Sequence, residues 1–381
     1  MKIAILSESA YPVLNGVSVS TDVLASGLTK RGHKVLLICP ENSNKNDSNN
    51  NYEIVRTPSY NIVSGYPLPY PNKNLIFSIL ENFKPDIVHC QIPFTYGLIA
   101  KEWTKLTNTT FSAFNHTKYV NYGHYAGILK DIIKVPLKSY LANFYNSADI
   151  VMTPSIMMKD ELKSYGVTKE ISVIPTGIPL PEAEDKNVTE EIRRKYNISP
   201  TDKVVIYLSR IAKEKNIHLL IDSFNELYSK YNNLKLMVCG GGPDFKELVA
   251  YRDTLQSREN IIFTGGVEKK QVYNYLYCGD IFAFPSTTET QGLAVCEAMA
   301  CGLCVVAVNE GGTVESIENN VDGLLCGNNV NSFKSAISEI LDNEKLREKL
   351  SFNALKSAEN FSIKAMLDKY EDVFVGGGYY T

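Results

Sequence analysis

The chain has 381 residues, of which 44% are hydrophobic and 21% are charged, and its formal net charge is −3. These values are typical of a globular protein of two domains, and they exclude a disordered or fibrous chain. They also give no basic field for nucleic acid, so we expect no nucleic-acid partner. The longest apolar runs are much shorter than the ~20 residues that span a bilayer. No signal peptide is apparent, and we expect a cytoplasmic protein.

Strand-like apolar runs alternate with helical patterns from the first residues onward. The expected strands of the first half are residues 2–7, 34–39, 85–89, 110–114 and 149–153. A helical period covers residues 20–31, and Asn, Ser and Lys at 42–52 indicate an exposed loop. Strands separated by helices in this way predict a parallel sheet with right-handed crossovers.

A second alternation begins near residue 203, after a Pro-rich joint at 174–181. Its expected strands are 204–209, 235–239, 261–264, 281–284 and 304–307, and its expected helices are 218–231, 245–255, 270–277 and 294–300. We therefore predict an α/β protein with two Rossmann-like domains, at residues 1–177 and 178–360. The helix expected at 363–374 follows the last predicted strand.

Two loops that follow predicted strands carry candidate phosphate ligands. Gly16 precedes a helix expected to begin near residue 19, where backbone N–H groups can approach a phosphate, although such a glycine is often only structural. The loop lacks the G-x-G-x-x-G pattern, which disfavours a dehydrogenase. Arg210 and Lys215 follow the strand at 204–209 and could clamp two phosphates, the alternative being a solvated basic loop.

The stretch 285–300 is the most informative of the chain. Glu289 lies in the turn after a strand, and Glu297 lies eight residues later on the next helix, a little over two helical turns away. Carboxylates accept hydrogen bonds from paired hydroxyls, so the two residues suit sugar and ribose diols. The N–H groups of Gly292 and Leu293 at the helix start suit a phosphate.

His116 follows the strand at 110–114, where an imidazole can hydrogen-bond a substrate hydroxyl; a packed core histidine is the alternative. Cys301 and Cys304 have the spacing of redox and zinc sites, but no second pair stands at a suitable distance. We expect no metal site, and no role beyond structure for His89 and His218.

Together these residues resemble family 4 of the glycosyltransferases, along essentially the whole chain. The resemblance rests on the loop 12–16, Gly32-His33, the segments 85–89 and 174–178, His116, Arg210 with Lys215, the segment 240–243, and the Glu289-x7-Glu297 pair. It implies the GT-B fold, in which two Rossmann-like domains face one another across a cleft. It also implies that residues 361–381 form a helix crossing back to the first domain, plus a tail. Ser209 stands where the family often has Gly, and Thr176 where it usually has Asn, but neither removes a ligand group.

The resemblance implies a retaining hexosyltransferase that uses a nucleotide-sugar as substrate and needs no cofactor. Arg210 and Lys215 are then expected to neutralise the diphosphate, Glu297 to hold the ribose diol and Glu289 to touch the sugar. His116 is expected near the primary hydroxyl of that sugar. The chain has no Asp-x-Asp sequence, which fits a metal-independent transferase. A nucleotide-sugar epimerase and a non-catalytic binding module remain as alternatives.

The acceptor is a hydroxyl group that the sequence defines less well. Residues 286–293 are similar to the matching stretch of bacterial diacylglycerol glucosyltransferases, which implies UDP-glucose as donor and a lipid such as diacylglycerol as acceptor. In the helix-prone segment 128–144, Lys130, Lys134 and Lys138 recur every four residues and could contact the inner face of the cell membrane. Pro136 is expected to kink or divide this helix. The alternatives are an ordinary surface helix and a soluble sugar, glycan or protein acceptor.

Overall fold

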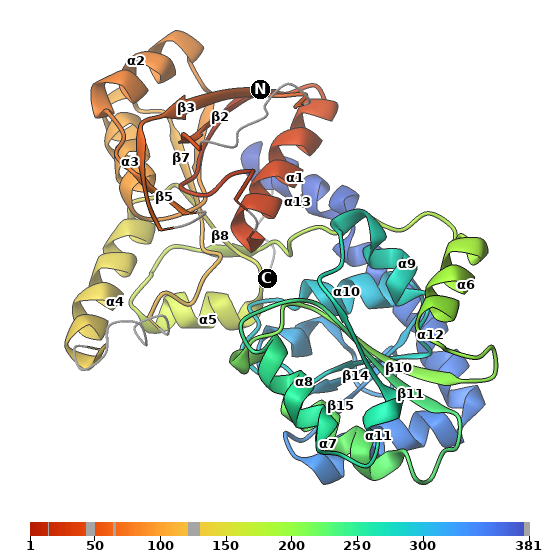
Figure 1. The fold of residues 1–381 in the computed structure, drawn as a ribbon. Helices are drawn as coiled ribbons and strands as arrows, with labels where there is room; N and C mark the ends of the chain where they lie inside the picture. The colour runs from red at the N-terminus through yellow and green to blue at the C-terminus, as the bar shows by residue number, and fades with distance from the viewer. Residues whose placement is uncertain (14, 43–49, 64–65, 121–129, 377–381) are drawn as a thin grey trace. The chain divides into compact units, whose positions relative to one another are not determined.

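The chain folds into two α/β units. The computed structural model describes residues 1–13, 15–42, 50–63, 66–120 and 130–376. Unit 1 comprises Met1–Gly177 together with Ile363–Thr381, and unit 2 comprises Ile178–Ser362 (Figure 1). The structure thus assigns residues 361 and 362 to unit 2 and the helix that follows them to unit 1.

Unit 1 contains a seven-stranded sheet of order β3-β2-β1-β6-β7-β8-β9, in which every pair of neighbours is parallel. Its strands are β1 (Lys2–Leu6), β2 (Lys34–Pro40), β3 (Glu53–Thr57), β6 (Ile87–Cys90), β7 (Thr110–Phe114), β8 (Ile150–Thr153) and β9 (Ile171–Val173). Its helices are α1 (Gly16–Lys30), α2 (Lys73–Phe83), α3 (Thr95–Thr107), α4 (Lys130–Asn146), α5 (Ile156–Ser164) and α13 (Ile363–Phe374). The antiparallel strands β4 (Ser59–Val63) and β5 (Tyr66–Pro69) form a separate hairpin.

Alternate residues of the interior strand β1 pack into two different cores. Ala4 and Leu6 pack with helices α2, α3 and α4, whereas Ile3 and Ile5 pack with α1 and α13. Successive side chains of a strand point to opposite faces, so a sheet buried on both faces needs apolar residues at every position. This explains the unbroken apolar run at the amino terminus.

Helix α13 packs beside α1 within unit 1 (Figure 1). Gly27 permits the approach, since a Cβ atom there would lie 2.5 Å from the side chain of Leu367. Arg31 donates to Asp368 at 2.7 Å and to Glu371 at 2.6 Å, and His33 lies 2.8 Å from Glu371. The C-terminal helix is therefore an integral layer of unit 1.

Two local expectations about helices need correction. Helix α1 begins at Gly16 rather than near residue 19, because Asn15 and Ser18 exchange the hydrogen bonds of a capping box. Helix α4 is not divided at Pro136. Its second half buries Leu141, Phe144 and Tyr145 in the core of unit 1, and such packing outweighs the low helix propensity of one proline.

Unit 2 contains a six-stranded parallel sheet of order β12-β11-β10-β13-β14-β15. Its strands are β10 (Lys203–Leu208), β11 (Leu234–Cys239), β12 (Ile261–Gly265), β13 (Ile281–Phe284), β14 (Cys304–Val308) and β15 (Gly323–Cys326). Its α-helices are α6 (Lys186–Lys195), α7 (Ile217–Leu227), α8 (Phe245–Asp253), α9 (Val272–Leu276), α10 (Leu293–Ala300), α11 (Val330–Asp342) and α12 (Glu344–Ala358). Short 3₁₀ turns are η2 (Lys213–Lys215), η3 (Arg258–Asn260), η4 (Lys269–Gln271), η5 (Gly312–Ser316) and η6 (Glu359–Phe361).

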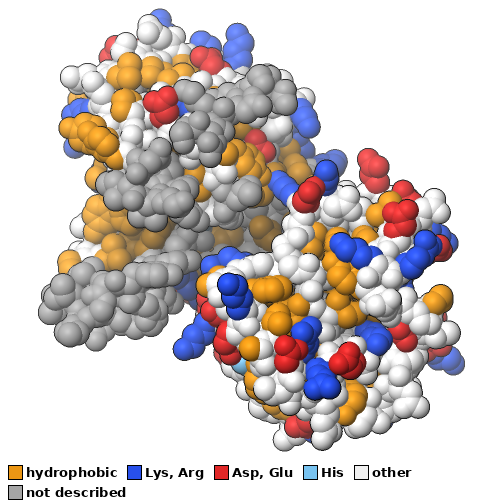
Figure 2. Space-filling view, in the orientation of Figure 1, with side chains coloured by type: hydrophobic (Ala, Val, Ile, Leu, Met, Phe, Trp, Pro, Cys, Tyr) orange, Lys and Arg blue, Asp and Glu red, His pale blue; other side chains and the backbone are white. Residues whose placement is uncertain are grey.

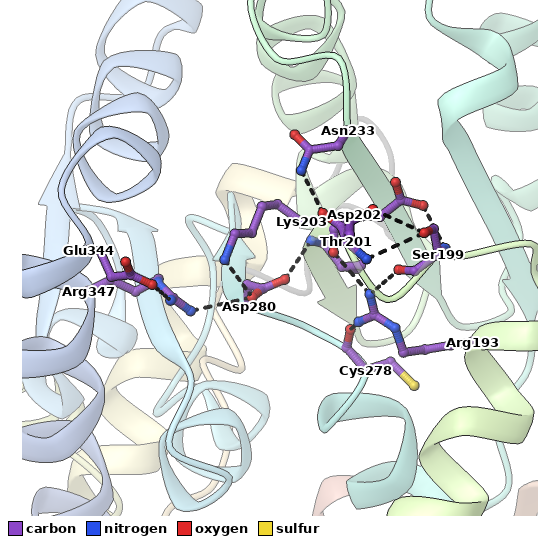
Figure 3. A network of polar contacts seen from close by, with 11 residues as sticks. Arg193, Ser199, Thr201, Asp202, Lys203, Asn233, Cys278, Asp280, Glu344 and Arg347 are labelled. Atoms are coloured by element: carbon purple, nitrogen blue, oxygen red, sulfur yellow. Dashed lines mark hydrogen bonds and ion pairs between the residues drawn. The ribbon is translucent and has the colours of Figure 1, made fainter.

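A polar network fastens the amino-terminal edge of this sheet (Figure 3). Asp280, just before β13, accepts a hydrogen bond from the backbone N–H of Val204 at 2.8 Å and from Arg347 at 3.4 Å. Arg193 donates to three backbone carbonyls, those of Ser199, Asp202 and Cys278, at 2.8–3.0 Å. The polar groups at this edge are hydrogen-bonded to one another, whereas the candidate ligand-binding residues lie at the opposite edge of the sheet.

Candidate functional site

The structure brings together two of the predicted site residues in unit 2. Lys215 closes the turn η2 after β10, and Glu289 lies in the turn after β13, the strand that pairs with β10. The Lys215 ammonium and a Glu289 carboxylate oxygen form an ion pair, with side chains only 14% and 18% exposed. Ser286 Oγ donates to the same carboxylate oxygen at 3.2 Å. A cation and a carboxylate 74 residues apart in sequence thus meet at the carboxyl edge of the sheet.

The two loops that carry this pair are hydrogen-bonded to each other. Asn216 adopts the left-handed conformation, with φ of 56°, and its side-chain amide donates to the carbonyl of Pro285 at 3.2 Å. The Thr288 hydroxyl donates to the carbonyl of Glu214 at 3.3 Å. Asparagine tolerates a positive φ better than most residues, so it suits this position. The two loops that carry Lys215 and Glu289 are therefore held together by hydrogen bonds.

Arg210 lies apart from that pair. Its guanidinium forms an ion pair with Glu214, four residues later, and the two side chains are 60% and 42% exposed. Its backbone is better fixed, since its carbonyl accepts a hydrogen bond from Tyr207 at 3.2 Å. Exposed pairs of this type contribute at most ~1 kcal/mol, so a stronger anion can displace Glu214. The Arg210 guanidinium is therefore accessible to solvent, and it does not take part in the Lys215–Glu289 pair.

Gly292 and Leu293 form the tightly packed start of helix α10. Gly292 has φ of +87°, and a Cβ atom there would lie 2.7 Å from the hydroxyl of Thr313. No side chain caps this helix. Within the described residues, the Thr313 hydroxyl is fully buried and has no hydrogen-bond partner. The N-terminus of α10 thus presents backbone N–H groups that suit an anion.

Glu297 lies in the second turn of α10 and is half-buried. Burial disfavours its charged form and raises the pKa of the carboxyl from 4.5 to about 7, with a smaller opposing effect from Lys269. Among the described residues, no hydrogen bond to its carboxylate is found. A buried carboxylate without donors of its own is suited to a ligand that supplies them, such as a diol.

In unit 1, His116 follows β7 and stacks on Phe114, with ring centroids 4.2 Å apart. Its Nε2 contacts Oε1 of Gln91, which is fully buried. Burial, with a smaller effect of His89, lowers the pKa of His116 to about 3, so the imidazole is neutral at pH 7. The structure gives His116 a defined orientation that the sequence did not reveal.

Gly16 is exposed at the first position of α1, with open space where a Cβ atom would lie. The glycine is therefore not required by packing at this point. The Asn15 cap accepts a hydrogen bond from the N–H of Ser18 at 2.9 Å, which already serves one of the free amides of the helix start.

Gln91 and Thr313 are the two residues at these sites that the sequence reasoning missed. Gln91 directly follows β6, and His116 is the second residue after the neighbouring strand β7, so strand adjacency was a usable signal. Thr313 lies in a Gly-Gly-Thr turn after β14, and its closeness to Gly292 could not be read from spacing.

The proposed membrane segment is only partly described. Residues 128 and 129, and the side chains of Lys130 and Lys134, lie outside the described part of the chain. Lys138 is half-buried, with its ammonium 5.2 Å from the centre of the Tyr165 ring, and Val135 is 73% exposed. Among the described residues, no helix is long and apolar enough to cross a membrane.

Charge and cysteine chemistry add little elsewhere. On the face of unit 2 drawn in Figure 2, Lys and Arg side chains are interspersed with Asp and Glu. All eight cysteines are free thiols, and Cys304 is buried. The described residues contain no group of three or more His, Cys, Asp or Glu side chains that could hold a metal ion.

Two family models match the chain, one on each unit. The model described as Glycosyltransferase Family 4 matches residues 14–181. The model described as Glycosyl transferases group 1 matches residues 188–357. Together they cover the loops described above and every strand of the two sheets except β1.

The chain is also similar to individual proteins of known name. It is 31% identical over 316 residues to an alpha-monoglucosyldiacylglycerol synthase of Streptococcus pneumoniae, an alignment spanning 81% of this chain and 71% of that protein. It is 28% identical over 388 residues to the synthase of the same name from Acholeplasma laidlawii, spanning 98% and 97%. Anabaena HepE in complex with UDP has the same fold, with a TM-score of 0.80 at 16% identity over 99% of this chain and 100% of that one. HepE has also been crystallised with UDP-glucose.

Proposed function

Because this chain belongs to the family 4 glycosyltransferases, with two Rossmann-like units of the GT-B type, we propose that it moves glucose from UDP-glucose to diacylglycerol with retention of the α configuration. One observation carries the donor part of this proposal. At the carboxyl edge of the unit 2 sheet, Lys215 is held beside Glu289. Among the described residues, the start of α10 has no side-chain cap and the Glu297 carboxylate has no hydrogen bond, so both remain for a ligand. A cation, a helix N-terminus and a carboxylate are what a diphosphate and a ribose diol require.

In the proposed reaction the acceptor hydroxyl oxygen bonds to the anomeric carbon as the bond from that carbon to the UDP oxygen breaks. The bonding electron pair leaves with UDP, and the hydroxyl proton passes to the departing phosphate. Negative charge therefore grows on the diphosphate in the transition state. Arg210 and Lys215 stabilise that charge, Glu289 orients the sugar and Glu297 holds the ribose.

The proposal that diacylglycerol is the acceptor is supported by the names of two relatives, which are both alpha-monoglucosyldiacylglycerol synthases. A soluble sugar, a glycan or a protein is the alternative acceptor. An epimerase of the same fold would convert the sugar nucleotide with no acceptor present, which separates it from a transferase in one measurement.

The test is a panel of UDP-, GDP- and ADP-linked hexoses incubated with diacylglycerol in mixed vesicles. We expect UDP release and a glucolipid product from UDP-glucose alone, with an anomeric proton signal of the α configuration. UDP-glucose turnover that needs a soluble acceptor and ignores diacylglycerol would replace the lipid proposal. Sugar interconversion without any acceptor would replace the transferase proposal.

We further propose that α4 contacts an anionic membrane through Lys130, Lys134 and Lys138. Each Lys near such a surface contributes ~1 kcal/mol, so three together change vesicle binding by up to about 100-fold. Wild-type protein should co-sediment with anionic vesicles, and the triple Lys→Ala variant should not. The matched control removes three exposed lysines of α12, namely Lys345, Lys349 and Lys356, with the same change in net charge. Equal retention of both variants would contradict a specific role of α4.

A further inference from the structure

A chain of hydrogen-bonded side chains runs beneath His116 in unit 1. Ser112 Oγ lies 2.9 Å from Nδ1 of His89, and Nε2 of His89 lies 3.1 Å from the amide nitrogen of Gln91. The other end of that amide, Oε1, meets Nε2 of His116. Ser112, His89 and Gln91 are all completely buried. Three of the four partners are thus shielded from water, and His116 is the end that reaches the surface.

The amide group of Gln91 determines which atom donates and which accepts in each hydrogen bond of this network. In the amide orientation of the structure, Oε1 of Gln91 faces His116 and can only accept a hydrogen bond, which assigns the proton to Nε2 of His116. The amide nitrogen can only donate, so Nε2 of His89 is bare, and Nδ1–H of His89 donates to Ser112. In a neutral imidazole one nitrogen carries the proton, and Nδ1 of His116 is therefore a bare acceptor.

The surroundings hold this arrangement in place. The backbone N–H of Gln91 donates to the carbonyl of Leu6 at 3.1 Å, which fixes the residue at the sheet edge. His89 is enclosed by the edges of Tyr370 and Phe374 of α13, each with its ring centroid 5.8 Å away. Burial lowers the pKa of His89 to about 3, as it does that of His116, so both histidines are neutral at pH 7.

We propose that Gln91 is a positioning residue that fixes the tautomer of His116, so that His116 offers Nδ1 as an acceptor to a hydroxyl of the donor sugar. The proposal rests on the proposed function, in which His116 meets that sugar. It makes the specificity explicit: a bare Nδ1 accepts from a sugar O–H group and repels a phosphate or carboxylate oxygen. A donor whose sugar lacks that hydroxyl loses this interaction.

The first test needs no substrate and so stands even if the donor is not UDP-glucose. Nitrogen NMR of full-length protein labelled in its histidine rings reports which nitrogen of each ring is protonated. At pH 7 we expect His116, assigned by the loss of its signals in His116→Asn, to carry its proton on Nε2. In Gln91→Met the two tautomers should mix. A His116 protonated on Nδ1, or one unaffected by Gln91→Met, would overturn the proposal.

The second test separates positioning from mere stability. Loss of the partner that orients a metal-bound histidine costs about 10–100-fold in activity, and by analogy Gln91→Met should lower kcat by about that factor. The control is Thr57→Val, which deletes a buried hydrogen bond to Tyr96 in the same unit without touching the His116 network. It should destabilise unit 1 similarly but leave kcat within about twofold, as expected for a change distant from the reacting groups.

A substrate variant completes the cycle. With the 6-deoxy analogue of the donor, wild-type activity should fall by the factor that Gln91→Met causes with the normal donor. Combining the two changes should cause little further loss, because both remove one interaction. Independent, multiplicative losses would show that Gln91 does not act through the contact between His116 and this hydroxyl.

Discussion

Replacing Glu297 by Gln tests whether a buried carboxylate binds the donor in its charged form. The carboxyl has a pKa of about 7 because burial disfavours its charge. A ribose diol donates two hydrogen bonds and therefore stabilises the carboxylate rather than the acid. Binding of the donor should then release the proton and return the pKa of the bound carboxyl towards 4.5, its ordinary value.

The size of the effect follows from that pKa. At pH 6 about nine-tenths of the free protein would carry the proton, and at pH 8 about one-tenth would. The affinity for UDP-glucose should therefore rise about tenfold from pH 6 to pH 8, which is ~1.4 kcal/mol. UDP-glucose is the appropriate ligand because its two phosphates stay singly ionised throughout this range, unlike the terminal phosphate of UDP.

Calorimetric titration at pH 6, 7 and 8 in buffers of different ionisation enthalpy measures both the affinity and the proton released. In Glu297→Gln the affinity should be lower at pH 8, and its pH dependence should disappear. An affinity of the wild-type protein that is flat between pH 6 and pH 8, or an equal slope in both proteins, would refute the reasoning.

The same pKa has a consequence for stability with the opposite sign. The folded carboxyl has a higher pKa than the unfolded one, so folding is favoured by the protonated form, and that stability is lost as pH rises from about 4.5 to about 7. A shift of this size corresponds to ~3 kcal/mol. Glu297→Gln should therefore melt at a higher temperature than wild type at pH 8 and at nearly the same temperature at pH 4.5.

Three further changes test separate parts of the structure. Arg210→Ala should lower kcat about 10²–10³-fold, as the loss of one transition-state donor does elsewhere, and unchanged turnover in a steady-state assay would remove Arg210 from the mechanism. Glu289→Gln should lower kcat but bind UDP more tightly in calorimetry, because Lys215 loses the carboxylate that competes with the phosphate; weaker UDP binding would contradict that competition. Asp280→Ala should cost about 2 kcal/mol in urea unfolding, through the lost hydrogen bonds to Val204 and Arg347, while leaving UDP affinity unchanged.

The parallel sheets were predictable because a strand buried on both faces is an unbroken apolar run. Residues 204–208 and 281–284 show this pattern, and they form the adjacent strands β10 and β13. Strand β3 at Glu53–Thr57 was missed because its only apolar residues, Ile54 and Val55, are half-buried at the sheet edge. Strand β15 was also missed, since the last strand expected in the second sheet was 304–307. Its four residues begin with Gly323, which gives no strand signal.

The site was predictable in its residue types but not in its pairing. Parallel strands put their carboxyl ends at one edge, so loops after β10 and β13 were expected to share a ligand. Lys215 forms its ion pair with Glu289, whereas Arg210 forms one with Glu214. This pairing depends on the length of the side chains and on the turn at Asn216. Residue spacing contains no such information. The Gln91–His116 contact is of the same kind, since it joins the loops that follow two adjacent strands.

The polar groups of the candidate site divide into two kinds, and the division has a physical reason. Lys215 and Glu289 satisfy each other, so the ligand-free protein avoids the cost of a buried, unpaired charge at this point. Among the described residues, the buried Thr313 hydroxyl has no such partner, and an unsatisfied buried group of this kind costs about 1–3 kcal/mol of stability. The half-buried Glu297 carboxyl has a desolvation cost instead, which raises its pKa. The carboxyl reduces its cost by holding a proton near neutral pH, which Thr313 cannot do. A ligand that donates to Glu297 removes that cost, whereas one that binds Lys215 must first displace Glu289. Recognition of the ribose is therefore expected to contribute binding energy, and capture of the diphosphate to contribute selectivity for a strong anion.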